Sequence, residues 1–165
     1  MAKALRAAFR ENANVLMVGE LRDYETMSAA VTAAETGHLV FASLHTNDAA
    51  QTVERIIDSF PASQQRQIIS QLSNTISGIV SQRLIPRARG GLIPAVEVLI
   101  ANTAVRNIIR ENKVEQLNIV ISTSADSGMI SMNQSLAKLV RSQEISLDQA
   151  EFYSSNLNEL RSLLK

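Results

Sequence analysis

Cysteine and tryptophan are absent from the 165-residue sequence, and aromatic residues make up only 4% of it. Without cysteine, the chain can form neither disulfides nor cysteine-based zinc sites. The missing aromatic volume means that a hydrophobic core must be built mainly from Leu, Ile, Val and Ala. Such a core is feasible, because hydrophobic residues still make up 45% of the sequence.

The sequence also lacks an excess of charge and a long apolar run. Its 16 basic residues balance 16 acidic ones, so we predict no nucleic-acid partner and no general attraction to anionic membranes. The longest apolar runs fall far short of the roughly 18–20 residues that span a bilayer, which predicts no transmembrane segment. The amphipathic N-terminus is not that of a signal peptide, and we expect a cytoplasmic protein.

A phosphate-binding loop of the form G-x-x-x-x-G-K-[ST] is a third absence. None of the six glycines begins such a motif. Backbone amides of such a loop normally cradle the β- and γ-phosphates of a nucleotide. The residues discussed below could therefore complete a nucleotide site, but we do not expect them to make one alone.

Two short apolar segments predict strands of a parallel sheet. Val15–Val18 is apolar throughout and is followed by Gly19, and Leu39–Leu44 is the second segment. Such runs are typical of strands buried on both faces. Between them, Asp23 is placed to cap a helix over Tyr24–Thr36. Strands that alternate with helices indicate an α/β fold.

The remainder predicts further helices and one hairpin. Apolar residues recur at helical spacing from about Ser63 to about Ser81, and the Gly90-Gly91 pair separates two arms of a hairpin at a sheet edge. Beyond residue 100 the pattern indicates short helices, two of them begun by capping boxes at Ser131 and Ser146. We therefore predict a mostly parallel sheet with an edge hairpin over residues 1–100, and a helical subdomain over residues 101–165.

Two polar residues follow the predicted strands directly. Glu20 comes after the first strand and His45 after the second. The carboxyl ends of parallel strands lie at one edge of a sheet, where ligands bind, so neighbouring strands would place both residues at one site. A carboxylate there can hold Mg²⁺ or orient an attacking water. From position alone, loop residues bonded to backbone are an equally good interpretation.

Other polar residues favour structural roles when only their spacing is considered. His38 and His45 lie an odd number of residues apart with a strand between them, so their side chains should point to opposite faces rather than share a metal. We predict that His38 is a strand-start residue bonded to backbone. Arg22 and Asp23 are predicted to form a surface pair, with Asp23 also capping the helix.

The segment FRENANVLMVGELRD, from Phe9 to Asp23, resembles the Walker B signature of the type II/type IV secretion ATPases. Ala13 and Asn14 replace the Pro and Asp of that signature. The resemblance implies that Glu20 is the Walker B carboxylate, which acts at Mg²⁺ and at the attacking water. It also implies that Gly19, Arg22 and Asp23 help to bind the nucleotide and its metal.

Two further motifs follow in the family's order. TGHLVFASLHT, from Thr36 to Thr46, resembles the His box, which implies that His45 is catalytic near the γ-phosphate and that His38 is structural. AVRNIIRE is similar to the AIRNLIRE motif of the PilT-type retraction branch, whereas extension members usually carry a four-cysteine zinc module. The motif residues are Ala104, Val105, Arg106, Asn107, Ile108, Ile109, Arg110 and Glu111.

The resemblance implies the C-terminal half of a RecA-like P-loop ATPase, with ATP and Mg²⁺ as ligands. The family works as homohexameric rings on the cytoplasmic face of the bacterial inner membrane, where a pilus platform protein is the partner and retraction drives twitching motility. We expect this chain alone to be inactive. One alternative is a non-catalytic interaction module that docks through Val105, Ile108 and Ile109, although these residues fit a core better. Another is a fragment of an extension or secretion ATPase.

Overall fold

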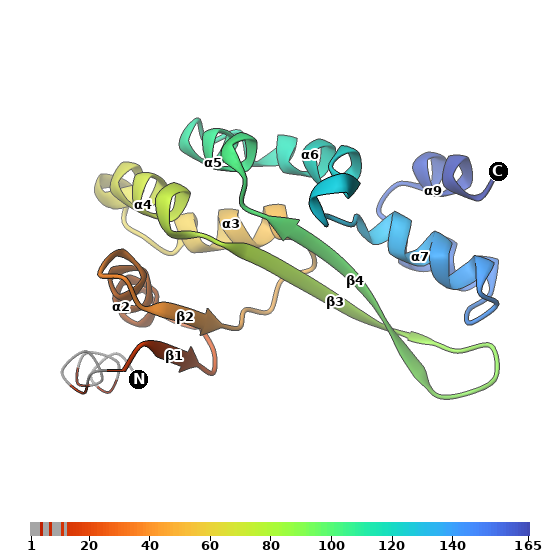
Figure 1. Cartoon of the computed structure of the whole chain (residues 1–165), viewed down its shortest axis with the longest axis horizontal. Coiled ribbons are helices and arrows are strands. Elements are labelled where there is room, and N and C mark those ends of the chain that lie inside the picture. Colours follow the sequence, from red (N-terminus) through yellow and green to blue (C-terminus); the bar gives the residue numbers. More distant parts are fainter. Residues whose placement is uncertain (1–3, 5–6, 8–10, 12) are drawn as a thin grey trace. The chain divides into compact units, whose positions relative to one another are not determined.

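The computed structural model describes residues 4, 7, 11 and 13–165 (Figure 1). The signature residues Phe9, Arg10 and Asn12 lie outside the described residues. The described strands and α-helices, in chain order, are β1 (Val15–Val18), α2 (Tyr24–Glu35), β2 (Leu39–Ala42), α3 (Ala49–Asp58), α4 (Ala62–Thr75), β3 (Gly78–Pro86), β4 (Leu92–Ile100), α5 (Thr103–Arg110), α6 (Leu117–Thr123), α7 (Met132–Arg141), α8 (Leu147–Tyr153) and α9 (Leu157–Leu164).

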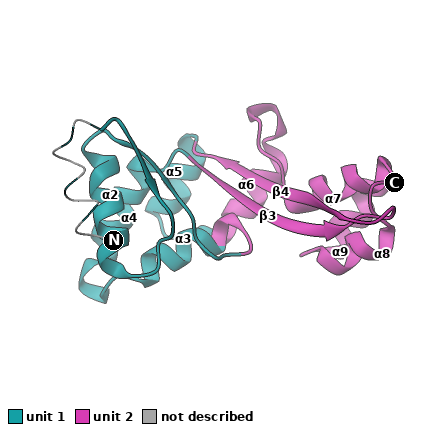
Figure 2. Cartoon of the chain, turned by 90° about the horizontal axis from the view of Figure 1, so that it is seen from below, with its two compact units in different colours: residues 1–46, 51–77, 102–114 teal, residues 47–50, 78–101, 115–165 magenta. Residues whose placement is uncertain are grey.

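The chain divides into two compact units, coloured separately in Figure 2. The first contains residues up to Thr46, Gln51–Ser77 and Asn102–Val114. The second contains Asn47–Ala50, Gly78–Ala101 and Glu115–Lys165. The hairpin thus groups with the helical tail, and α5 groups with the first unit, so this packing differs from the predicted division at residue 100.

The first unit is built on a parallel pair of strands. β1 and β2 pair in register from Val15 opposite Leu39 to Val18 opposite Ala42. Between them, α2 begins after Asp23, whose side chain accepts a hydrogen bond from the Thr26 amide, and it ends before Gly37, which has a φ of +96°. These features confirm the predicted strand–helix–strand order, although β2 ends at Ala42 rather than at Leu44.

The prediction that these strands are buried on both faces is wrong. Leu16 and Val18 on β1 are buried, but the alternate residues are not. The exposed side chains belong to register partners and therefore share one face of the pair: Val15 (56% exposed), Met17 (72%), Leu39 (48%) and Phe41 (54%). We refer to these four residues as the open sheet face.

The predicted helix over Ser63–Ser81 is also wrong at its C-terminal end. α4 stops at Thr75, and Gly78–Ser81 belongs to β3. A Cβ at position 78 would lie 2.9 Å from the Leu99 carbonyl oxygen, so the close approach of the two strands requires glycine there. Ile79 and Val80 fit helical and strand patterns equally well, which is why periodicity alone extends the helix too far.

The second unit contains the hairpin and the helices of the tail. β3 and β4 pair antiparallel, and the turn between them uses Gly90 and Gly91 at φ of +89° and +80°. Within the described residues, the hairpin forms a two-stranded sheet of its own rather than the edge of the parallel pair. Both predicted capping boxes are present, at Ser131 with Gln134 and at Ser146 with Gln149.

One side of the hairpin packs against helices. α7 contacts β4 and α8 contacts β3. The buried residues of this cluster are Ile85, Ala95, Met132, Leu136, Ala137, Ile145, Ala150 and Leu160. A folded hairpin is stable when such a helix layer covers one of its faces, so this cluster is the main hydrophobic core of the second unit.

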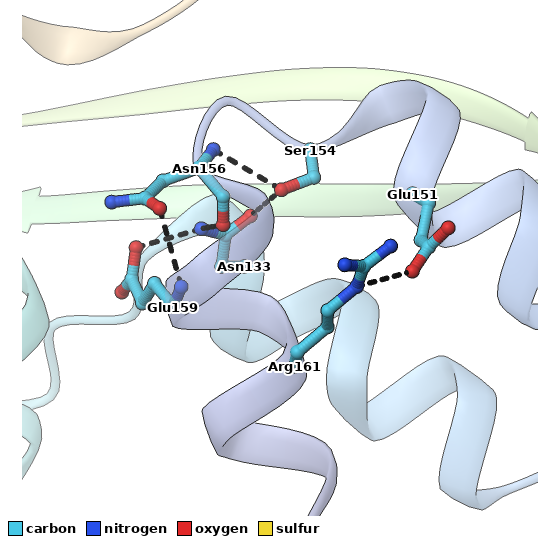
Figure 3. A network of polar contacts seen from close by, with 6 residues as sticks. All are labelled: Asn133, Glu151, Ser154, Asn156, Glu159 and Arg161. Atoms are coloured by element: carbon cyan, nitrogen blue, oxygen red, sulfur yellow. Dashed lines mark hydrogen bonds and ion pairs between the residues drawn. The ribbon is translucent and has the colours of Figure 1, made fainter.

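A polar network joins α7 to the last helix (Figure 3). Asn133 is buried, and its Nδ2 atom donates to the Asn156 carbonyl oxygen at 3.1 Å and to Glu159 Oε2 at 2.7 Å. Its Oδ1 atom accepts from the Ser154 hydroxyl at 2.8 Å. All the polar atoms of this buried amide are thereby engaged, as burial requires.

A buried carboxylate lies on β4 in the same unit. Glu97 Oε1 accepts a hydrogen bond from the Ala49 amide, at the start of α3, at 2.9 Å. Burial raises the pKa of Glu97, and the hydrogen bond from Ala49 opposes that rise. Glu97, on the hairpin, therefore supplies an acceptor to the first amide of α3, which has no partner within its own helix.

In the part of the chain that the structure describes, no helix has both the length and the apolar character needed to cross a membrane.

Candidate functional site

Glu20 and His45 lie together at the carboxyl ends of β1 and β2. The backbone ladder continues beyond the strands, because the Leu21 amide donates to the Ser43 carbonyl oxygen at 2.9 Å. This pairing brings Glu20 Oε1 to 3.3 Å from His45 Nε2. The side chain of Glu20 is 22% exposed and that of His45 is 80% exposed. The predicted placement of both residues at one sheet edge is confirmed.

The second carboxylate oxygen of Glu20 forms an ion pair with Arg22. Arg22 Nε lies 2.6 Å from Glu20 Oε2, and the Arg22 side chain is 76% exposed. The predicted surface pair between Arg22 and Asp23 is therefore wrong, since Arg22 reaches back to Glu20. Asp23 is instead occupied as the cap of α2.

Asp23 is held by the first turn of α2. Its Oδ1 atom accepts from the Thr26 amide at 2.8 Å, and both carboxylate oxygens accept from the Thr26 hydroxyl at 3.0 Å. These bonds, the one from the amide above all, lower the pKa of Asp23. The predicted capping role is confirmed, and its role at a nucleotide stays a prediction.

These residues line a cleft at the end of the parallel pair. Gly19, Glu20, Arg22 and Asp23 line it, and its volume is about 400 Å³. The four residues predicted from the Walker B resemblance are thus brought to one hollow. His45 contacts this group through Glu20.

The donor set of the cleft bears on Mg²⁺. Among the described residues, no group of three or more His, Cys, Asp or Glu could enclose a metal ion. Mg²⁺ is, however, usually held by one or two carboxylates together with substrate phosphates and water. The single carboxylate of Glu20 fits that mode of binding, in which the nucleotide itself supplies further ligands.

His38 lies at the other end of β2 and has backbone partners. Its Nδ1 atom is 3.1 Å from the Ala33 carbonyl oxygen and 3.1 Å from the Thr36 hydroxyl. Its own amide donates to the same Ala33 carbonyl. The prediction of a strand-start histidine bonded to backbone is confirmed, and these bonds join the end of α2 to the start of β2.

The AVRNIIRE segment forms most of α5, and two of its apolar residues are core residues. Val105 and Ile109 are each 0% exposed, so they are not available to dock a partner. Arg106 Nη1 donates to the carbonyl oxygens of Ser73 at 3.0 Å and Asn74 at 2.8 Å. These carbonyls end α4 and have no partner within that helix, so Arg106 supplies their missing donor.

The residues that hold the segment around His45 were not predicted from the sequence. Ser43 donates its hydroxyl to the Gly19 carbonyl oxygen, Arg55 Nη1 lies 3.4 Å from the His45 carbonyl oxygen, and the hydroxyls of Thr46 and Thr52 are 2.7 Å apart. Only Ser43 gave a sequence signal, as the one polar residue in the apolar run before His45.

Comparisons with known proteins agree with the motifs. A family model described as type II/IV secretion system protein matches residues 1–151. A twitching motility protein of Neisseria gonorrhoeae is 49% identical over 94% of this chain and 42% of its own length. The type IV pilus retraction ATPase PilT of Pseudomonas aeruginosa is 44% identical over 90% of this chain and 43% of its own.

A solved structure extends the likeness to three dimensions. The crystal structure of the pilus retraction motor PilT with bound ADP matches 98% of this chain and 45% of that chain, with a TM-score of 0.86 and 49% identity. The partial RecA-like α/β fold with a helical tail is thereby confirmed. The chain spans less than half the length of each of these relatives.

Proposed function

The chain belongs to the type II/IV secretion system protein family, and on that premise we propose that it contributes the Walker B and His-box half of an ATPase motor. The complete motor is a homohexamer that hydrolyses ATP with Mg²⁺ and powers type IV pilus retraction. It works at the cytoplasmic face of the inner membrane against a pilus platform protein. The names of the relatives, a twitching motility protein and a retraction ATPase, support this proposal.

The contact between Glu20 and His45 carries the proposal. A carboxylate and an imidazole lie 3.3 Å apart at the carboxyl ends of neighbouring parallel strands, which is where ligands bind in open α/β sheets. The cleft beside them contains Gly19, Arg22 and Asp23 as well. A chain released from catalysis would have no need to keep these groups together.

Glu20, Arg22 and His45 each have a role in this proposal. Glu20 accepts a hydrogen bond from the attacking water and orients it toward the γ-phosphorus, and it would hold the metal directly or through water. Arg22 and His45 lie beside that carboxylate. Their hydrogen-bonding groups would stabilise the negative charge that develops on the phosphoryl oxygens. Bound Mg²⁺ would neutralise phosphate charge. Gly19 lines the cleft without a side chain.

Two observations favour retraction over the extension and secretion branch. The sequence contains no cysteine, whereas the extension members usually carry a four-cysteine module. AVRNIIRE forms a helix in which Val105 and Ile109 are buried and Arg106 caps α4. The interaction-module alternative is weakened because two of its three docking residues are core residues.

The test is ATP turnover by the purified chain, alone and mixed with the upstream portion of the P. aeruginosa relative, which would supply the phosphate loop. We expect no turnover alone and measurable turnover in the mixture. Glu20→Gln should lower the rate of the mixture by about 100-fold or more, because oriented general-base groups contribute on that scale.

Glu115→Gln is the matched control, because this carboxylate is exposed and lies in the second unit. Its mixture should turn over ATP at the unsubstituted rate. Turnover by the chain alone that Glu20→Gln abolishes would overturn the proposed division of labour. A mixture that binds but never hydrolyses ATP would refute the proposed catalytic role.

A further inference from the structure

Ser43 is bonded to the backbone on both sides of Glu20. Its carbonyl oxygen accepts from the Leu21 amide at 2.9 Å, and its hydroxyl donates to the Gly19 carbonyl oxygen. Residues 19 and 21 flank the carboxylate directly. Glu20 is therefore held between two backbone atoms that are both bonded to one residue of the neighbouring loop.

The same residue stands close to His45 along the chain. Beyond Ser43, the loop is held from α3, where Arg55 Nη1 lies 3.4 Å from the His45 carbonyl oxygen and the Thr46 and Thr52 hydroxyls are 2.7 Å apart. These contacts orient the far end of the loop. Ser43, at the start of the segment that leads to His45, forms the bonds that join this segment to Gly19 and Leu21.

The side chain of Ser43 is not part of the hydrophobic core. Ser43 is exposed, so its side chain is not needed to fill volume. A Cβ at Gly19 would meet nothing within 4 Å, so side-chain packing does not hold Gly19 in place. A backbone segment that packing does not hold keeps conformational freedom, and ordering it costs entropy. A hydrogen bond to its carbonyl oxygen restricts that conformational freedom.

We propose that Ser43 is a positioning residue whose hydroxyl sets the distance between the Glu20 carboxylate and the His45 imidazole. Its meaning for catalysis rests on the proposed function, but the positioning itself does not. Removing the hydroxyl should leave the fold and the Leu21–Ser43 backbone bond intact, and it should free the Gly19 side of Glu20 to move away from residue 43. The contact between Glu20 and His45 would then be formed for a smaller fraction of the time.

The test is a double-substitution cycle read by NMR on the whole chain with ¹⁵N-labelled histidine. In the unsubstituted chain, Glu20→Gln should shift the His45 Nε2 resonance, because the two groups touch. In the Ser43→Ala background, the same change should shift it by less than half as much. In Ser43→Thr, which keeps a hydroxyl, the effect should return.

Ser142→Ala is the matched control, because that exposed serine also donates its hydroxyl to a backbone carbonyl, of Leu139 at 3.1 Å. It should leave the effect of Glu20→Gln unchanged. An effect of equal size in Ser43→Ala and in the unsubstituted chain would overturn the inference. If Ser43→Ala loses its fold by circular dichroism, the proposal fails unless Ser43→Thr keeps the full effect.

ATP turnover provides a second test of the role of Ser43. In the mixture with the upstream portion of the relative, Ser43→Ala should lower kcat by about 10-fold to 100-fold with KM for ATP little changed, because misplaced catalytic groups cost rate rather than binding. Ser43→Thr should restore kcat. If the unsubstituted mixture has no turnover, the proposed function fails, while the NMR cycle still decides the role of Ser43.

Discussion

The two units of this chain differ in how completely their sheets are covered. In the second unit, one side of the hairpin packs against α7 and α8 around residues such as Leu136 and Ala95, which are 0% exposed. In the first unit, β1 and β2 bury Leu16 and Val18 on one side, and their other side is the open sheet face. Both sheets leave their other side exposed, since Val80 (69% exposed) and Leu84 (51%) lie on the hairpin. The covered side differs, because both hairpin strands bury residues there whereas β2 buries none.

The polar groups differ in the same way. In the second unit they are paired inside the structure, as in the network of Asn133 and in the two capping boxes. In the first unit, Glu20, Arg22 and His45 stand at strand ends and line or adjoin an open cleft. The candidate chemistry therefore resides in the first unit.

The largest effect is expected from the core of the second unit. Leu136→Ala removes a side chain that is 0% exposed and should lower the free energy of unfolding by about 2–5 kcal/mol, because it leaves a cavity. Urea unfolding followed by circular dichroism measures it. Leu157→Ala, at a residue that is 43% exposed, should cost well below that. A loss under about 1 kcal/mol for Leu136→Ala would contradict the comparison.

Glu97 should produce the next largest effect. Glu97→Ala leaves the Ala49 amide without its acceptor and should cost about 1–3 kcal/mol, the usual penalty for an unpaired buried group. Glu97→Gln keeps an acceptor oxygen of the same shape and should cost less. Equal losses in the free energy of unfolding for the two substitutions would show that the hydrogen bond from the Ala49 amide does not contribute to stability.

The pH dependence of Glu97 has a definite sign. Because burial raises the pKa of this carboxyl, the folded chain keeps its proton to a higher pH than the unfolded chain does. The unfolded state therefore binds fewer protons in this window, and the stability from Glu97 is lost as pH rises through the folded pKa. Relative to Glu97→Gln, the unsubstituted chain should gain stability as the pH falls from about 8 toward about 4.

Arg106 tests the first unit, where a smaller effect is expected. Arg106→Ala removes donors from the last carbonyls of α4 and should cost about 0.5–1.5 kcal/mol, the usual net contribution of a hydrogen bond. Amide exchange should quicken in the last turn of α4. Arg106→Lys should recover part of the loss, since one ammonium cannot match the guanidinium fork. Unchanged exchange in α4 would refute the capping role.

Much of the local structure could be predicted because its signals are local. Asp23 and the capping boxes are short patterns with one physical solution each, and the Gly90-Gly91 turn required the positive φ that was found. The meeting of Glu20 and His45 followed from the rule that parallel strands end at one edge. Each of these inferences depends on a few neighbouring residues.

The failures concern contacts that the local sequence pattern does not specify. The spacing of Ile79 and Val80 fits a helix, and only the close approach of Gly78 to the Leu99 carbonyl oxygen shows that they belong to a strand. Apolar alternation could not tell that Met17 would be exposed, because burial depends on what else covers the strand. The sequence also gave no reason to connect Arg22 with Glu20 rather than with Asp23, or Arg55 with the loop of His45.

The smallest change in stability is expected at the open sheet face. Met17→Ser with Phe41→Ser should alter the free energy of unfolding by no more than about 0.5 kcal/mol, as surface changes usually do. Exposed apolar residues on a strand pair favour association with a second copy. Sedimentation over a range of concentrations should therefore show less self-association in this variant than in the unsubstituted chain. Phe152→Ser, at an 82% exposed residue of α8 in the second unit, is the control. If it reduces association as strongly, general surface hydrophobicity rather than the uncovered strand pair is responsible.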